Sequence, residues 1–414
     1  MRFFKFVIFA AAYQIDVVKL LRIKNMAFAI ICASFVGTSF GNNMFSDFYP
    51  LTKGDHSRTF EGGSVTEKNG VKVLDLHGTW KEMGRQYGYL AASCLQDIYQ
   101  NFLLPKIESG SDTIVNVHGI SEMLYSKYPA RLKQLIEGMA ETSGLTLQQL
   151  KLVNAVEYSA AVFNCSAMAA WGPYASGNLV YGRNYDAPGF QELFKDIVIV
   201  VYHPSDGALA TATIGYAGEI YAVNAMNEKG LFLELNNGMP SAGTEILFDR
   251  LASTTELLTM LMDAESLEYA DAFFHTVRGF ASYIIGIADA QEARSYEWCA
   301  QGVARADNAA PDGLMVMTNH YVSDSWNFPA ITDEESWASF TRRKDMMAMA
   351  EKYKGHIDVA RMQQIMQTSM SEHGPKHTAT VYQLVYEPKT MHLWMHIEGA
   401  NDWQEVDMHS FMKQ

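Results

Sequence analysis

The sequence has few cysteines, little positive charge and no long hydrophobic run, and each shortage excludes a class of protein. Four cysteines in 414 residues are too few for a disulfide-rich scaffold. The apolar runs near the N-terminus, residues 3–13 and 27–36, both fall short of the roughly 20 residues that span a bilayer. With 32 basic against 46 acidic residues, the net charge is −14, which disfavours nucleic acid as a partner. The composition therefore predicts a globular protein with an acidic, solvated surface.

The N-terminus carries the pattern of an export signal. Lys24 lies before an apolar run at residues 27–36, and small residues follow from Gly37 to Gly41. We therefore expect residues 1–41 to be a signal peptide, with Met26 as an alternative true start. The mature protein is then periplasmic or secreted, and a retained N-terminal anchor is the alternative.

Hydrophobic spacing predicts a largely helical first third and a strand-rich remainder. Before Cys165 we expect an irregular segment at residues 42–70 and a strand at 71–76. Three helices follow at residues 81–102, 129–142 and 146–156, and a capping box opens the last of them. After Cys165 we expect strands at residues 196–202, 208–214, 219–224 and 230–235, helices at 251–262 and 342–353, and a hairpin of strands 378–386 and 391–397. Strand clusters covered by helices indicate an α+β fold.

The most informative motif surrounds Cys165. The tripeptide Asn164-Cys165-Ser166 is followed by a segment that reads as a turn, Gly182-Arg183-Asn184-Tyr185-Asp186. A nucleophilic thiol needs a base and a positive neighbour. An N-terminal cysteine carries its own base, because a free α-amino group has a pKa near ~7.7 to 8.0. The motif indicates a nucleophile at Cys165 with Arg183 beside the sulfur and Asp186 at the α-amine; the alternative is a structural cysteine followed by a surface turn.

The motif resembles the start of the catalytic chain in cysteine-type N-terminal nucleophile hydrolases, the superfamily of choloylglycine hydrolase, acid ceramidase and penicillin acyltransferase. Segments similar to the penicillin-acyltransferase-like branch occur in order at residues 76–78, 82–88, 132–154, 227–237, 318–321 and 339–342. The resemblance implies a four-layer αββα sandwich of two antiparallel sheets covered by helices. It also implies self-cleavage between Asn164 and Cys165, which separates residues 42–164 from a catalytic chain of residues 165–414. The two chains are expected to stay associated.

The same resemblance supplies further candidates for the site. The segment at residues 227–237 provides an oxyanion-hole asparagine, which is Asn237 by its offset from Gly230 or Asn236 by its Leu-Asn pairing. Asn319 resembles the second asparagine of the family. Arg342 resembles its distal arginine, with Arg343 as an adjacent rival.

These residues predict an amidohydrolase that cleaves a linear N-acyl amide of a small molecule through an acyl-cysteine intermediate. An acyltransferase that passes an acyl group from a thioester to an amine uses the same residues, and a silent binding protein with the same fold is the third alternative. A homo-oligomer stays open.

We expect no cofactor and no metal, because the His373 and His377 pair is interrupted by Gly374-Pro375 and no nucleotide-binding motif occurs. Cys94 and Cys299 form either one disulfide or, more commonly for such residues, two buried thiols.

Overall fold

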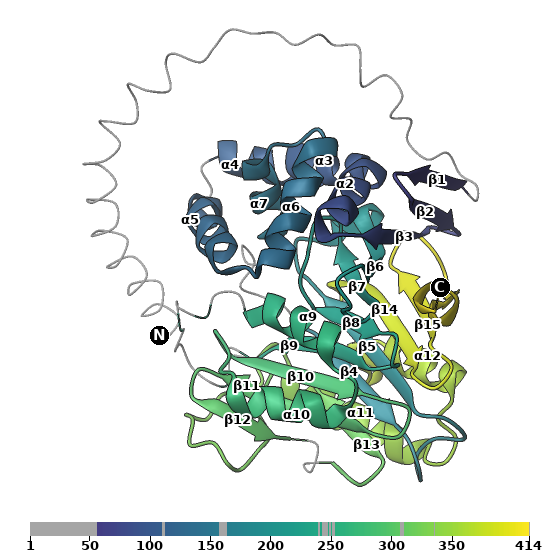
Figure 1. The fold of residues 1–414 in the computed structure, drawn as a ribbon. Coiled ribbons are helices and arrows are strands. Elements are labelled where there is room, and N and C mark those ends of the chain that lie inside the picture. Colours follow the sequence, from purple (N-terminus) through teal and green to yellow (C-terminus); the bar gives the residue numbers. More distant parts are fainter. Residues whose placement is uncertain are drawn as a thin grey trace, which may run out of the picture. The chain divides into compact units, whose positions relative to one another are not determined.

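Two β-sheets form the centre of the structure (Figure 1). The computed structural model describes residues 56–109, 112–156, 164–238, 241, 247, 250, 253–306, 310–334 and 336–413. All of these lie in one unit, Lys53–Gln414. The predicted signal peptide at residues 1–41 and the alternative start at Met26 lie outside the described residues. Within the described part of the chain, no helix combines the length and the apolar character needed to cross a bilayer.

The larger sheet has ten strands in the order β1-β2-β3-β6-β7-β8-β9-β10-β11-β12. Their bounds are His56–Phe60, Gly63–Lys68, Val71–Gly78, Ile197–Pro204, Thr211–Tyr216, Asn224–Asn227, Phe232–Asn237, Tyr283–Ala288, Ala293–Cys299 and Gly302–Arg305. The sheet is antiparallel as predicted, except that β3 and β6 pair in parallel. A parallel pair needs a long crossover, and the described part of this connection carries six α-helices, two other short helical segments and two strands of the other sheet.

The smaller sheet has six strands in the order β13-β4-β5-β14-β15-β16. Their bounds are Leu314–Met317, Ser166–Ala170, Val180–Asp186, Thr380–Glu387, His392–Ile397 and Gln404–Asp407. All of its neighbouring strands are antiparallel. The predicted C-terminal hairpin is confirmed as β14 and β15, and β16 extends it.

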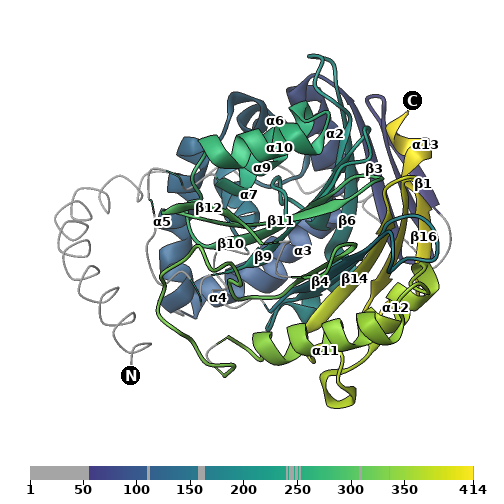
Figure 2. The same cartoon turned by 90° about the horizontal axis from the view of Figure 1, so that it is seen from below.

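The two sheets pack face to face through aromatic rings. Phe232 of β9 contacts Tyr181 and Tyr386 of the smaller sheet, with ring centroids 5.0 Å apart in both pairs. Helices α9 (Ser253–Asp263) and α10 (Leu267–Thr276) cover the larger sheet, and α11 (Ser339–Lys352) and α12 (Val359–Gln367) cover the smaller one (Figure 2). The predicted α+β sandwich with αββα layers is therefore confirmed.

The first third of the described chain is mostly helical, as predicted. Its helical segments α2, α3, η2, α4, α5, α6 and α7 span Trp80–Leu90, Ala92–Asp97, Ile98–Leu103, Leu104–Glu108, Asp112–Lys127, Ala130–Thr142 and Leu147–Asn154. The capping box is confirmed, since the Thr146 hydroxyl accepts from the Gln149 amide and the Gln149 side chain accepts in return. The single helix predicted at residues 81–102 is wrong, because Ala91 leaves helical geometry with φ −104° and ψ 14°.

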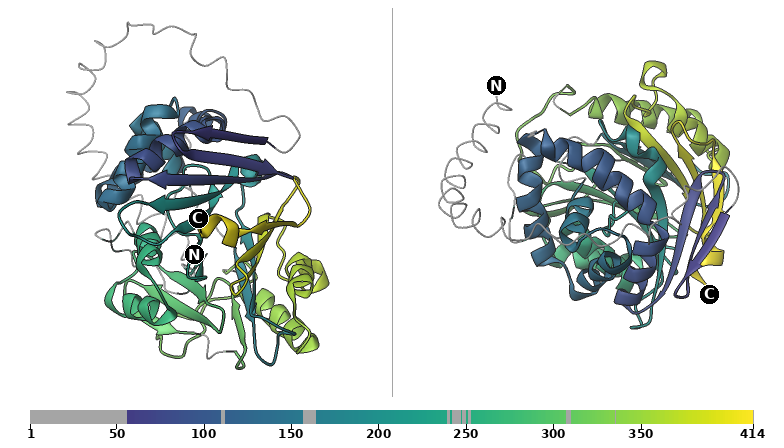
Figure 3. Two further views of the ribbon diagram at one scale, coloured as in Figure 1. Left: turned by 45° about the vertical axis from the view of Figure 1, so that its right-hand side comes forward. Right: turned by 90° about the horizontal axis from the view of Figure 1, so that it is seen from above.

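Two other predicted boundaries are also wrong. Residues 56–68 were expected to be irregular but form the β1–β2 hairpin, in which Glu61 and Gly62 have φ of 48° and 90°. Two consecutive positive φ values make the tight turn whose twist suits a hairpin. Figure 3 shows these strands at one end of the larger sheet. The strand expected at residues 219–224 begins only at Asn224, because Glu219 turns back to accept from the Tyr216 amide at 3.0 Å.

Three short elements complete the described structure. They are the 3-10 helices η4 (Gln191–Asp196) and η7 (Met370–Glu372) and the C-terminal helix α13 (Met408–Met412).

Candidate active site

Cys165 lies immediately before β4 and is only 2% exposed. Its strand pairs with β5 so that Ala167 lies opposite Arg183. Alternation along the two strands therefore puts the Cys165 and Arg183 side chains on the same face of the smaller sheet, toward the larger sheet. Cys94 and Cys299 are both buried free thiols and form no disulfide. Of the two alternatives for this pair, the structure therefore shows the buried thiols.

The segment Gly182–Asp186 is not a turn. It belongs to β5, which pairs with β4 on one side and β14 on the other, and all seven residues of the strand are buried. The polar residues of this segment suggest a surface loop. A central strand, however, forms its backbone hydrogen bonds with both neighbouring strands, so that only its polar side chains still need partners. The alternative of a surface Arg–Asp turn is therefore excluded.

Arg183 links the thiol to the larger sheet. Its Nη2 lies 3.4 Å from Cys165 Sγ and donates to the Leu235 carbonyl oxygen at 2.8 Å. Its Nη1 forms an ion pair with Glu234 of β9, and both side chains are fully buried. Glu234 also accepts from the Tyr181 hydroxyl at 3.2 Å. A guanidinium at this distance favours the thiolate over the thiol.

The structure separates the two rival asparagines of β9. Asn236 is fully buried and shares a strand face with Glu234, which contacts Arg183. Its Nδ2 donates to the Thr318 carbonyl oxygen at 3.2 Å. The Asn237 side chain points to the opposite face, and its backbone carbonyl accepts from Asn319 at 2.8 Å. Asn236 therefore projects from the larger sheet toward the smaller sheet and Cys165, and Asn237 does not.

Arg342 reaches the peptide bond that the motif predicts to be cut. From the first turn of α11, its Nη1 donates to the carbonyl oxygen of Asn164 at 2.5 Å and to that of Cys165 at 2.9 Å. Its Nη2 donates to Asn319 Oδ1 at 2.8 Å. The rival Arg343 is only partly buried and interacts electrostatically with Glu297. Arg342 is therefore the arginine that the structure brings to Cys165.

A hydroxyl network that the sequence did not reveal holds Asn319 in place. The Ser339 hydroxyl accepts from the Asn319 amide at 2.7 Å and donates to the Thr318 hydroxyl at 2.8 Å. It also lies 2.7 Å from His320 Nδ1. Burial, together with the charges of Arg343 and Arg342, lowers the pKa of His320 to about 4. At neutral pH this histidine is therefore uncharged, and the network positions Asn319 without adding a third cation.

Asp186 lies on the other face of β5, toward the helices. Asn184, two residues before it, donates to the Met366 carbonyl oxygen of α12 at 3.1 Å, which fixes the direction of that face. Asp186 Oδ1 accepts from the Thr380 hydroxyl at 2.6 Å. Among the described residues its buried Oδ2 has no hydrogen-bond partner. Burial raises the pKa of Asp186 to about 6, although the charge of Arg342, the Thr380 hydrogen bond and the charge of Arg183 oppose this.

Asp186 is also directly opposite the predicted cleavage site. The Asn164 amide donates to its backbone oxygen at 3.0 Å, which continues the β4–β5 pairing by one residue beyond Cys165. The predicted site residues thus surround one peptide bond: Arg183 at the sulfur, Arg342 at the carbonyl oxygens and Asp186 across the strand pair.

Sequence reasoning missed Glu234 and Thr380. Glu234 had a signal, because an acidic side chain in an otherwise apolar buried strand requires a partner. Thr380 had none, since nothing in the sequence relates it to Asp186.

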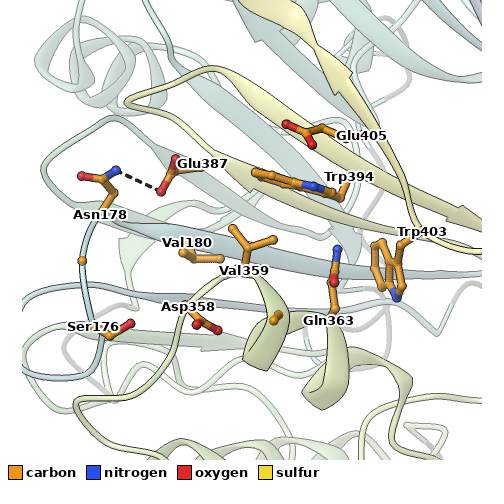
Figure 4. Close-up of a pocket in the computed structure, with 12 residues that line it drawn as sticks. Ser176, Asn178, Val180, Asp358, Val359, Gln363, Glu387, Trp394, Trp403 and Glu405 are labelled. Carbon is orange, nitrogen blue, oxygen red and sulfur yellow. Dashed lines mark hydrogen bonds between the residues drawn. The ribbon is translucent and has the colours of Figure 1, made fainter.

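The cavity shown in Figure 4 lies elsewhere. Its volume is about 630 Å³, and it lies between the start of β5, helix α12 and strands β15 and β16. Trp394, Trp403 and Gln363 line it, and Asn178 Nδ2 donates to Glu387 at 3.0 Å on its wall. None of the predicted site residues lines it. Val180, which lines the cavity, projects from the face of β5 opposite to the face that carries Arg183, so the cavity lies on the side of the smaller sheet away from the Cys165 thiol.

Similar solved structures include a Caenorhabditis elegans N-acylethanolamine-hydrolyzing acid amidase ortholog (16% identity, TM-score 0.41, covering 54% of this chain and 93% of that one). A variant of the conjugated bile acid hydrolase from Clostridium perfringens has 14% sequence identity and a TM-score of 0.41, and the match covers 59% of this chain and 93% of that one. Penicillin V acylase from Agrobacterium tumefaciens has 10% identity and a TM-score of 0.39, and the match covers 60% of this chain and 88% of that one. No curated protein matches significantly. The model of the acyl-coenzyme A:6-aminopenicillanic acid acyl-transferase family matches residues 174–402, more than half of the chain, which therefore belongs to this family, as the sequence resemblance predicted.

Proposed function

We propose that this chain is an exported, self-processing cysteine amidohydrolase that cleaves a linear N-acyl amide through an acyl-cysteine intermediate. Its family supports amide cleavage or acyl transfer as the chemistry. The observation that carries the proposal is the surroundings of the Asn164–Cys165 peptide. One guanidinium lies at the sulfur and another at the carbonyl oxygen of the same peptide bond.

In the uncut chain this arrangement supports an N-to-S acyl shift. The Cys165 sulfur adds to the Asn164 carbonyl carbon, and Arg342 stabilises the negative charge that develops on the oxygen. The carbon–nitrogen bond then breaks, the thiol proton moves to the leaving nitrogen, and the acyl group rests on sulfur as a thioester. Water hydrolyses the thioester and leaves the Asn164 carboxylate, the Cys165 thiol and a free α-amine.

After the cut, Cys165 acts as nucleophile and its own α-amine acts as base. The amine accepts the thiol proton and passes it to the leaving group of the substrate amide. The buried Asp186 carboxylate, whose Oδ2 is unsatisfied in the uncut chain, orients the new ammonium. Asn236 supplies a donor to the oxyanion, a contribution of roughly 2.7–4 kcal/mol.

We favour hydrolysis over transfer because an exported enzyme meets abundant water and few activated acyl thioesters. The acyl acceptor is the only difference between the two reactions, so every residue above serves both. The substrate is a small-molecule N-acyl amide that gains access to the thiol only after the Asn164–Cys165 bond is cut, because the thiol is only 2% exposed in the uncut chain.

The test is the maturation of the purified protein. The expected result for the wild type is two chains, the second of which begins at Cys165 by N-terminal sequencing, and release of free acid from a panel of N-acyl amides. Cys165→Ala should stay a single inactive chain. Cys299→Ala is the matched control, since it removes another buried thiol and should be cut and active like the wild type.

Three results would overturn parts of the proposal. Cutting of Cys165→Ala at the same bond assigns the processing to an outside protease. Turnover by an uncut wild type excludes the α-amine as base. A wild type that stays whole and inert favours a binding protein with the same fold.

A further inference from the structure

Three potential metal ligands meet on the larger sheet, far in sequence from Cys165. His203 Nε2 lies 2.8 Å from Asp75 Oδ1, and His77 Nε2 lies 3.2 Å from Asp75 Oδ2. One ligand atom from each residue lies within 4.8 Å of the other two. Among the described residues this is the one group of three or more such side chains with that spacing.

The sheet itself creates this meeting. Asp75 and His77 are two residues apart on β3 and therefore project from the same face. β3 and β6 lie side by side in the larger sheet (Figure 1). Their parallel register sets His77 opposite His203. The two imidazole rings stack with centroids 4.3 Å apart and planes within 4° of each other, so the partly exposed His77 ring has to turn about its side-chain bonds for both Nε2 lone pairs to point at one ion.

The backbone beside the site is held in place. Gln86 of α2, which is 1% exposed, accepts from the His77 amide at 2.9 Å and donates to the His77 carbonyl oxygen at 2.8 Å. It thus takes the place of a strand beside the last residues of β3.

We propose that Asp75, His77 and His203 bind a divalent transition-metal ion of the zinc class. Two imidazoles and one carboxylate are a ligand set that zinc and its neighbours accept, with the remaining position filled by water. Metal–ligand bonds of about 2.0–2.1 Å in tetrahedral geometry require ligand atoms about 3.3 Å apart, and the observed spacing brackets this value. Each imidazole then carries its proton on Nδ1 and offers the Nε2 lone pair to the metal.

Access and charge support the same conclusion. The His77 side chain is 36% exposed, which leaves an entry path, whereas the His203 and Asp75 side chains are 13% and 9% exposed. The single carboxylate offsets part of the charge of a divalent ion.

The site has a structural consequence that rests on the proposed function. β3 precedes Cys165 and β6 follows it, so self-cleavage would place Asp75 and His77 on one chain and His203 on the other. A bound metal would then join the two chains.

The test titrates chelator-treated full-length Cys165→Ala protein with ZnCl₂ by isothermal calorimetry, and with CoCl₂ by visible absorption. The Cys165→Ala background removes the nucleophilic thiol as a competing ligand and keeps the chain uncut, so the result does not depend on self-cleavage. We expect one bound zinc ion and cobalt bands typical of low coordination number. His203→Gln and His77→Gln should each bind zinc at least about tenfold more weakly.

His392→Gln is the matched control, because His392 lies beside two carboxylates, Glu405 and Asp407, outside the site. It should bind zinc like the parent protein. Absence of zinc binding by the parent, or unchanged affinity in both His203→Gln and His77→Gln with circular dichroism equal to the parent, would reduce the cluster to Asp–His hydrogen bonds. Equal loss in His392→Gln would place the metal elsewhere.

Discussion

Arg183 has a part both in the proposed chemistry and in the packing of the core. Its Nη2 contacts Cys165 Sγ, while its Nη1 neutralises Glu234 where neither side chain reaches solvent. Removing one member of a buried ion pair leaves the other charge unpaired in a medium that solvates it poorly. A substitution of Arg183 therefore reports on folding as well as on catalysis, and the two effects must be measured separately.

We predict that Arg183→Ala, in a Cys165→Ala background, lowers the free energy of unfolding by about 3–5 kcal/mol. The physical reason is the uncompensated Glu234 carboxylate. Arg183→Met combined with Glu234→Leu should recover most of that loss, because it removes both charges. Urea unfolding measures the free energy of unfolding of both variants. A loss below about 1 kcal/mol for Arg183→Ala would contradict a buried ion pair between Arg183 and Glu234.

Asp186 gives a pH-dependent prediction in the uncut chain. Its pKa is about 6 in the folded state against 3.8 for the free residue, so folding favours the protonated form. The contribution of Asp186 to the stability of the fold is complete below the pKa of the unfolded state, 3.8, and is lost as the pH rises through the pKa of the folded state, about 6. The loss amounts to about 2.4 kcal/mol between about pH 4 and pH 7.

The check compares Cys165→Ala with Cys165→Ala/Asp186→Asn by urea unfolding at both pH values. Asparagine does not titrate, so the double variant should gain stability relative to its parent on going to neutral pH. All other titrating groups cancel in this comparison. If the difference in free energy of unfolding between the two variants is the same at both pH values, Asp186 does not ionise inside the fold.

At the scale of elements, α2 and α6 touch through glycines. A Cβ at Gly84 would lie 2.2 Å from the Leu135 carbonyl oxygen, and one at Gly138 would lie 2.3 Å from the Lys81 carbonyl oxygen. Backbone atoms cannot retreat at such positions unless the helices separate. These contacts explain why glycines occur inside two helices, where they otherwise weaken the helix.

Gly84→Ala should therefore lower stability by about 1–3 kcal/mol through overpacking, although alanine is the better helix former. Gly119→Ala is the control, because Gly119 is exposed in α5 and a Cβ there meets nothing within 4 Å. It should raise stability by up to about 1 kcal/mol. Thermal unfolding measures the stability of both variants relative to the parent protein. A Gly84→Ala variant that is more stable than the parent would contradict the close contact between α2 and α6.

The elements themselves were predictable where the signal is local. The helix α6 and the capping box of α7 follow from spacing and from side chains three residues apart. The strand β5 was read as a turn because its buried polar residues look like those of a loop. Its neighbours β4 and β14 supply the missing information, and they come from other parts of the chain.

At the scale of the whole molecule, the larger sheet joins residues from both sides of Cys165. β1, β2 and β3 precede the predicted cut, and β6 to β12 follow it. Backbone pairing from Val73 with Ile199 to Gly78 with Pro204 connects the two parts.

We therefore predict that the two chains of the cut wild type elute together in size-exclusion chromatography and separate only under denaturing conditions. The uncut Cys165→Ala protein provides the reference elution volume. Separate elution of the two chains in native buffer would contradict this prediction.

The sequence alone determined the family, the layered α+β fold and the set of residues around Cys165, because these depend on short motifs in a fixed order. Tertiary structure decided Asn236 over Asn237 and Arg342 over Arg343, since adjacent residues differ only in the direction in which a strand or helix points them. It alone paired Arg183 with Glu234 and brought His203 to Asp75, because a buried charge or a ligand set is completed by strands that the chain order does not relate.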